Sequence, residues 1–217
     1  MARQKLPRFI HNAQADNVIE RGKELYTIVK GQWRKEYFRN DNPIVLELAC
    51  GKGEYTVGLA KKFPEKNFIG IDIKGDRIAR GSKRAIEAGL KNVAFLRTPI
   101  AFLEEFFKEQ EVDEIWLIHP DPQPRDKEEK KRLTNTNYLN LYRKVLKSNG
   151  NFYFKTDNCG LFEYSLKTFV EANYTILRYT TDLYNSELLA EHHYIVTHYE
   201  RLFVEKGFKI NYLAAKP

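Results

Sequence analysis

The sequence predicts an α/β fold with a doubly wound, mostly parallel sheet of seven strands, and two observations lead to this. Apolar, strand-like runs alternate with helical patterns from residue 44 to the C-terminus. The first run, residues 44–48, enters a short turn with Gly51 and Gly53, and the next strand ends at the acidic Asp72. In doubly wound folds, an acid about 20 residues beyond such a turn accepts hydrogen bonds from ribose hydroxyls. The pattern therefore predicts a nucleoside-bearing ligand.

The remaining elements follow from the spacing of apolar residues and from turn signals. Residues 17–38 are predicted to form one or two helices that cap the sheet edge. Further helices are predicted directly after Gly53 and at residues 75–90, 100–109, 137–147 and 161–172. The strands are predicted at residues 44–48, 68–71, 92–96, 112–118, 151–155, 174–179 and 208–214.

The composition is that of one soluble domain with a substantial core, because 42% of the 217 residues are hydrophobic. The two cysteines, Cys50 and Cys159, lie far apart and have no Cys or His partners at metal-ligand spacing, so we expect neither a disulfide nor a metal site. No run of about 18 apolar residues could span a membrane, and the first residues lack the apolar block of a signal peptide. We expect a cytoplasmic protein without membrane contact, and the sequence leaves monomer and homodimer open.

The net charge of +7 and the pI near 9.2 favour an anionic partner. Three cations, Arg3, Lys5 and Arg8, precede the first acid, Asp16. We predict a flexible basic arm over residues 1–15, followed by a single domain over residues 16–217. A solvated terminus and an arm that contacts phosphate both explain this charge.

The turn after the first strand is the predicted ligand site. Glu47 precedes it, and only Gly51 and Gly53 are present, whereas the dinucleotide fingerprint has three glycines. A cofactor without a pyrophosphate therefore fits better. A plain tight turn is the alternative for an acid and two glycines at this spacing.

Polar residues follow three other strands at the edge where such sheets bind ligands. Three prolines in five residues stiffen the loop after the fourth strand and direct Asp121 above the sheet edge. Thr98 ends the third strand and is a candidate for the rim around an adenine, and Asp157 follows the fifth strand. A surface turn is the alternative for Asp157.

Four ordered motifs resemble those of the tRNA (guanine-N7-)-methyltransferases. The segment Glu47-Leu48-Ala49-Cys50-Gly51-Lys52-Gly53 is similar to the first motif of S-adenosylmethionine-dependent methyltransferases. The more specific matches are Pro120-Asp121-Pro122-Gln123 with Lys130-Lys131-Arg132-Leu133-Thr134, Lys155-Thr156-Asp157-Asn158 with Leu161-Phe162-Glu163-Tyr164, and Thr197-His198-Tyr199-Glu200. The resemblance spans about residue 43 to the C-terminus.

The resemblance implies a Rossmann-like fold of the class I methyltransferase type and the activity of that family. The expected reaction is transfer of a methyl group from S-adenosyl-L-methionine to guanine N7 in tRNA, at position 46 of the variable loop. Tight positioning of the reactants dominates such a transfer, because N7 already carries an in-plane lone pair.

The resemblance also assigns roles to individual residues. The cofactor would be held by Glu47, Gly51, Gly53, Asp72 and Asp121, and Thr98, named from its place at the strand end, would take the position where relatives often have an acid. Asp121 would lie between cofactor and base and act in catalysis, and the substrate would contact Arg125, Asp157, Thr197 and Glu200. Thr197-x-x-Glu200 also matches a helix capping box, and the two roles are compatible.

The sequence departs from the family pattern in four respects, one of which is that no acid follows the third strand, where relatives often have one near the adenine. Ala49 stands where a glycine is commoner, and Arg125 replaces the usual lysine of the loop. Three acids, Asp126, Glu128 and Glu129, reduce the positive charge of the segment that follows.

Two alternatives from other classes stay open at this point. A methyltransferase acting on a small molecule or protein would keep the cofactor motif but would not need the basic segments. A non-catalytic tRNA-binding protein would keep the charge but not the pocket. A dehydrogenase is disfavoured, because the third glycine is absent and no hydride-handling site is recognisable.

Overall fold

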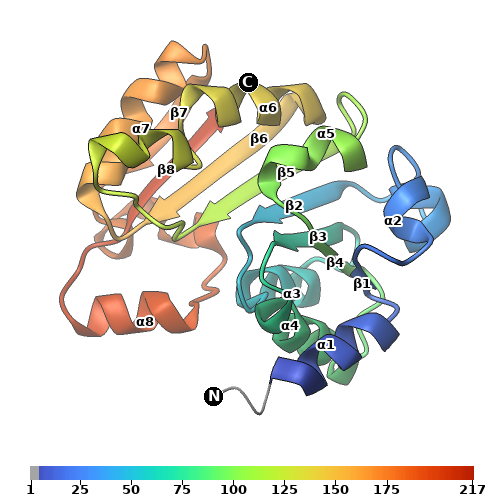
Figure 1. Cartoon of the computed structure of the whole chain (residues 1–217). Coiled ribbons are helices and arrows are strands. Elements are labelled where there is room, and N and C mark those ends of the chain that lie inside the picture. Colours follow the sequence, from blue (N-terminus) through green and yellow to red (C-terminus); the bar gives the residue numbers. More distant parts are fainter. Residues whose placement is uncertain (1–4) are drawn as a thin grey trace.

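The computed structural model describes residues 5–217 and has one sheet of eight strands with helices on both faces (Figure 1). The strand order is β1-β4-β3-β2-β5-β6-β8-β7. Strand β8 is antiparallel to both β6 and β7, and all other pairs are parallel. The predicted mostly parallel sheet is confirmed, with one strand more than the seven expected.

The elements have the following bounds. The strands are β1 (Val18–Ile19), β2 (Ile44–Leu48), β3 (Asn67–Asp72), β4 (Val93–Arg97), β5 (Val112–Ile118), β6 (Leu146–Thr156), β7 (Thr175–Thr180) and β8 (Asn211–Lys216). The helices are α1 (Lys5–Gln14), α2 (Leu25–Ile28), α3 (Glu54–Lys62), α4 (Gly75–Glu87), α5 (Leu103–Phe106), α6 (Thr136–Val145), α7 (Cys159–Glu171) and α8 (His198–Glu205). The predicted helix over 100–109 is shorter, with a 3₁₀ turn at Ile100–Phe102 before α5.

The additional strand comes from a segment that was predicted to be helical. Val18 and Ile19 are fully buried and pair with Phe95 and Leu96 of β4, so they extend the sheet edge. After β1 the chain forms only the four-residue α2 and a π-helix at Trp33–Phe38. The prediction of one or two capping helices over 17–38 was wrong about β1, because two residues are too few to show the alternation that marks a strand.

Helix α1 includes most of the residues predicted to form a flexible arm. Asn12 donates to the carbonyl of Gly75 at 2.8 Å, and the ring of His11 lies 2.8 Å from the Ser82 hydroxyl, so α1 is held against α4. Residues 5–14 are therefore helical and packed onto the domain. Arg3 lies outside the described residues.

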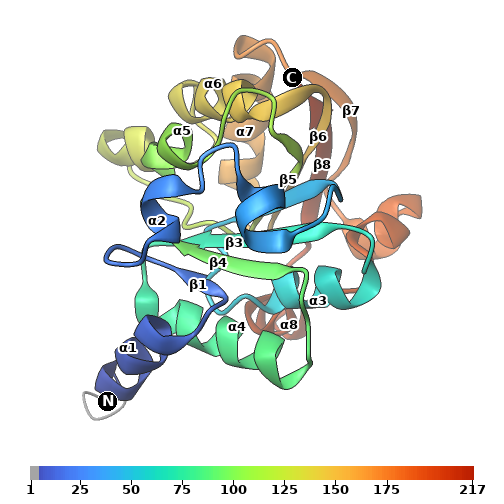
Figure 2. The ribbon, with the colours of Figure 1, turned by 90° about the vertical axis from the view of Figure 1, so that its right-hand side faces the viewer.

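Two apolar clusters cover the two faces of the sheet. In Figure 2, α5, α6 and α7 lie above the sheet, and α1, α3 and α4 lie below it. One cluster joins Leu46 and Leu48 of β2 to side chains from α5, α6 and α7. The other joins Val45 to side chains from α3 and α4. Burial on both faces explains why β2 is an uninterrupted apolar run apart from Glu47. No helix among residues 5–217 is long and apolar enough to cross a membrane.

Candidate functional site

The turn after β2 has a left-handed backbone at three positions. Ala49, Gly51 and Gly53 have φ values of 55°, 55° and 63°. A Cβ on Gly53 would lie 2.5 Å from the Phe95 ring, so glycine is required there by packing as well as by conformation. Ala49 adopts the left-handed region without that freedom, which gives the turn a strained residue at its start.

Asp72 fixes this turn from the neighbouring strand. One carboxylate oxygen accepts from the backbone N–H of Gly51 at 2.9 Å, and the other accepts from that of Lys74 at 2.8 Å. A carboxylate offers about four acceptor positions, so half of its capacity remains for a ligand. Asp72 therefore keeps acceptor positions at the carboxyl edge of the sheet, and its ribose contact stays a prediction.

Glu47 is buried beneath the turn. It accepts hydrogen bonds from the backbone N–H of Thr56 at 2.7 Å and from the Thr56 hydroxyl. Burial raises the pKa of Glu47 to about 8, because the hydrogen bonds from Thr56 only partly offset the loss of hydration. Glu47 is thus mainly protonated at neutral pH, and a nearby cation would favour its ionised form.

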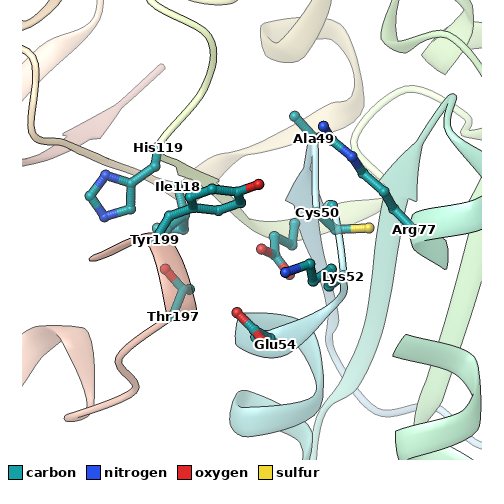
Figure 3. A pocket seen from close by; sticks show the side chains of 11 residues that line it. Ala49, Cys50, Lys52, Glu54, Arg77, Ile118, His119, Thr197 and Tyr199 are labelled. Carbon is teal, nitrogen blue, oxygen red and sulfur yellow. The ribbon is translucent and has the colours of Figure 1, made fainter. Parts of the chain in front are cut away.

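Two adjoining cavities lie at the carboxyl edge of the sheet. The smaller, of about 100 Å³, is lined by Glu47, Gly51 and Thr197, and the larger, of about 740 Å³, by Asp72, Asp121 and Asp157. Both are lined by Ala49, Arg77, His119 and Tyr199. Figure 3 shows His119 and Tyr199 on one side, with Ala49 and Arg77 opposite. The structure therefore brings six of the predicted site residues to one continuous site.

His119 stands at the centre of a polar cluster beside this site. Its Nδ1 lies 3.1 Å from Oδ1 of Asp157, and its Nε2 lies 3.6 Å from Oε2 of Glu200. The backbone of His119 is left-handed, with φ of 46°, and follows directly on β5. These contacts position one oxygen of Asp157 at the cavity wall.

Glu200 is fully buried and paired with Lys155. The Lys155 ammonium donates to both carboxylate oxygens at 3.0 and 2.8 Å, and the Tyr184 hydroxyl donates at 3.1 Å. Burial opposes ionisation of Glu200, but the interactions with His119 and Lys155 outweigh it and lower its pKa to about 2. Burial lowers the pKa of Lys155, and the Glu200 charge opposes that shift. In this conformation Glu200 does not reach the cavities.

The capping box is half formed. Thr197 is the N-cap of α8 and accepts from the backbone N–H of Glu200 at 3.2 Å, as predicted. The Glu200 side chain turns to Lys155 and Tyr184. Glu200 is also the single buried residue of α8, so a buried ion pair anchors this helix where an apolar face would be usual.

Besides Gly53 and Glu200, two predicted site residues line neither cavity. Arg125 donates to both oxygens of Glu128 at 2.8 and 2.6 Å and lines neither of the two cavities. Thr98 is buried, lines neither cavity, and its hydroxyl has no partner among the described residues. Asp121 is exposed on the loop and accepts a long contact of 3.4 Å from the backbone N–H of Gln123.

Sequence reasoning missed four residues of the site: Lys155, His119, Tyr199 and Arg77. His119 follows an apolar strand in the same way as Asp157, and this signal could have identified it. Tyr199 follows the N-cap of α8 by two residues, which places it on the first turn facing the cavities. Lys155 stands in a matched motif, but nothing local shows that it is buried, since a lysine inside a strand is ordinarily an exposed residue.

The chain is similar in sequence to known methyltransferases. A family model described as "Putative methyltransferase" matches residues 41–213. A tRNA (guanine-N(7)-)-methyltransferase of Cytophaga hutchinsonii is 49% identical over 215 residues, which cover 98% of this chain and 97% of the relative. The protein of the same name from Bacteroides fragilis is 46% identical, with 98% and 85% covered.

Solved structures agree in fold. A 16S rRNA methyltransferase, KamB, superposes with a TM-score of 0.64 at 16% identity, covering 86% of this chain and 91% of that one. An antibiotic-related methyltransferase gives a TM-score of 0.64 at 17% identity, with 94% and 98% covered. At this identity the likeness concerns the fold alone.

Proposed function

This chain belongs to the family of tRNA (guanine-N7-)-methyltransferases, and from that premise we propose that it transfers a methyl group from S-adenosyl-L-methionine to guanine N7 in tRNA. By the resemblance of its motifs, the target is the guanine at position 46 of the variable loop. One observation carries the proposal: the turn held by Asp72 opens into the same continuous site that Asp121 and Asp157 line. A tRNA substrate agrees with the expected cytoplasmic location.

The residues around the turn fit a sulfonium nucleoside. The carboxylate of Asp72 keeps free acceptor capacity for ribose hydroxyls, and the larger cavity has the size of a typical ligand site. Glu47 lines the smaller cavity, and a sulfonium bound there would favour its ionised form. The orphaned hydroxyl of Thr98 at the end of β4 is available to a base if the adjoining loop adjusts.

Methyl transfer requires that guanine N7 be aligned with the methyl group and that the charge developing on the purine be stabilised. S-adenosylmethionine supplies an electrophilic methyl group when bound. The lone pair of guanine N7 forms the new N–C bond as the C–S bond breaks, and the purine becomes cationic. No general base is needed, because N7 has no proton to lose. Asp121 and Asp157 stabilise the charge that develops on the purine, since both carboxylates line the larger cavity.

The residues predicted to contact the substrate differ in whether they reach the cavity. Asp157 lines the cavity, and we assign it to the N1–H and exocyclic amine of the guanine. Glu200 could share that role only after the Lys155 pair opens, and in the closed conformation it positions His119 and α8. Tyr199, about half exposed between the two cavities, offers a ring on which an unstacked base can stack.

The test is to incubate the purified protein with labelled S-adenosylmethionine and unmodified tRNA, digest the product, and identify the labelled nucleoside. The expected result is 7-methylguanosine at position 46, with no labelling of a transcript in which that guanine is replaced. Label on a protein or small molecule and none on tRNA would overturn the proposal. Binding of tRNA without uptake of cofactor would favour a non-catalytic role.

A further inference from the structure

A row of exposed cations extends from the site along α4. Arg80 lines two shallow grooves, one of about 300 Å³ toward α1 and one of about 480 Å³ toward α8. The first groove is shared with Lys83, and the second with Arg84 and Arg201. We define the α4 basic face by these residues and one at the site itself: Arg77, Arg80, Lys83, Arg84 and Arg201.

The α4 basic face is continuous with the methylation site. Arg77 lines both cavities of the site and begins the row. Residues three and seven positions further lie on the same side of a helix, so Arg80 and Arg84 extend it. At about 1.5 Å of rise per residue, the row is about 10 Å long. A ligand seated on it would also reach the rim of the site.

Cations on this face are available to a partner. Arg80, Lys83 and Arg201 form no ion pair within the described part of the chain, and Arg84 pairs with Glu54 at 3.2 Å. Free cations in a row suit a polyanion, because phosphates can replace their counterions without first breaking ion pairs.

The loop after Asp121 has fewer cations free to bind phosphate, although the family resemblance assigns it a substrate contact. Glu128 pairs with Arg125 at 2.6 Å and lies 3.6 Å from Lys131. Arg132 stacks on Tyr164 at 4.5 Å and donates to the carbonyl of Gln123 at 3.1 Å. Three cations of this loop are thus engaged by the chain itself, whereas Lys127 and Lys130 form no ion pair among the described residues, so the α4 basic face is a second phosphate-binding surface beside this loop.

We propose that the α4 basic face binds backbone phosphates of the tRNA that flank the methylated nucleotide. This inference rests on the proposed function, because it takes the polyanion to be the tRNA substrate. The contacts are to phosphate, so they contribute affinity and orientation without reading sequence. They also seat the tRNA beside α8, whose residues Thr197 and Tyr199 line the cavities.

The test compares two charge-matched double variants. Arg80→Gln with Lys83→Gln removes two cations of the α4 basic face. Lys30→Gln with Lys167→Gln is the control, because both residues are exposed and their chain neighbours pack on the opposite face of the sheet. The affinity for unmodified tRNA is measured by filter binding from about 50 to 300 mM salt. Thermal unfolding and cofactor affinity check that each variant is folded.

The first double variant is expected to bind tRNA roughly tenfold more weakly near physiological salt. The slope of log K against log salt should fall in magnitude by about 1.8, since each lost phosphate contact contributes about 0.9. The control should keep the wild-type slope. An unchanged slope in the first variant, or an equal loss of tRNA affinity in both variants, would overturn the proposal that the α4 basic face binds tRNA. The methylation proposal would be left intact. Wild-type protein that forms no 7-methylguanosine would instead overturn the proposed function.

Discussion

The ammonium of Lys155 lies 2.8 Å from a carboxylate oxygen of Glu200, and both side chains are fully buried. Lys155 comes from β6 and Glu200 from α8, so this pair ties the helix beside the cavities to the sheet. No other side chain of α8 is fully buried, although Phe203 packs partly against the apolar cluster and the backbone N–H of His198 donates to Glu54 at 2.8 Å. The pair therefore has consequences for stability as well as for substrate binding.

Replacing Lys155 with Met should lower the free energy of unfolding by about 3–5 kcal/mol, because it leaves the Glu200 charge buried and unpaired. The double variant Lys155→Met with Glu200→Leu should recover most of this loss. Denaturant unfolding of the three proteins measures both effects. A single variant that costs less than about 1 kcal/mol would contradict the buried pair.

The same pair predicts an acid-sensitive contribution to stability. The pKa of Glu200 is lowered from 4.5 to about 2 in the folded protein. Its contribution is therefore fully present above pH 4.5 and is lost as the pH falls toward 2. The stability difference between wild type and the double variant should change across that interval, as followed by unfolding at each pH. A difference independent of pH would argue against ionised Glu200.

Cofactor affinity should rise with pH because of Glu47. Its pKa is raised to about 8, and a carboxylic acid attracts a cation only when ionised, so a sulfonium should bind more tightly from pH 6 to 8 and level off above. Calorimetry with S-adenosylmethionine measures this. Glu47→Gln should flatten the profile, and S-adenosylhomocysteine, which lacks the sulfonium charge, should show a weaker dependence. Identical profiles for the two ligands would exclude Glu47 as the cause.

Asp157→Asn should reduce single-turnover methylation by about 10²-fold, because the amide cannot stabilise a cationic purine. Cofactor affinity should stay within about twofold of wild type. The matched control is Asp126→Asn, an exposed acid of the loop that lines neither cavity. Unchanged turnover in the Asp157 variant would remove this residue from the site.

Ala49→Gly should raise the free energy of unfolding by up to about 1 kcal/mol, because it relieves a left-handed residue with φ of 55°. The control is Ala13→Gly, an exposed position in α1, which should cost about 0.5–1 kcal/mol. Thermal unfolding of both variants gives the comparison. Destabilisation by Ala49→Gly would show that the strain at this position is small.

The sequence alone determined the elements that depend on local pattern. Apolar runs and glycine turns predicted β2 through β8, although β6 begins at Leu146, five residues before the predicted start and inside the predicted end of the preceding helix, and the four motifs identified the family. Parallel strands end at one edge, so Asp72, Asp121 and Asp157 could be expected to meet there, and all three line one cavity. The spacing of apolar residues can predict these strands and helices because the pattern repeats over many residues.

Tertiary structure decided what single residues do. Val18 and Ile19 became a strand only because β4 offered a free edge, and Lys155 is buried only because α8 brings Glu200 to it. Arg125 pairs with Glu128, whereas Arg77 and Arg80, beside the site, form no ion pair among the described residues. A pairing energy depends on which charges fold together and on how much water they lose, and neither quantity is present in the order of the residues.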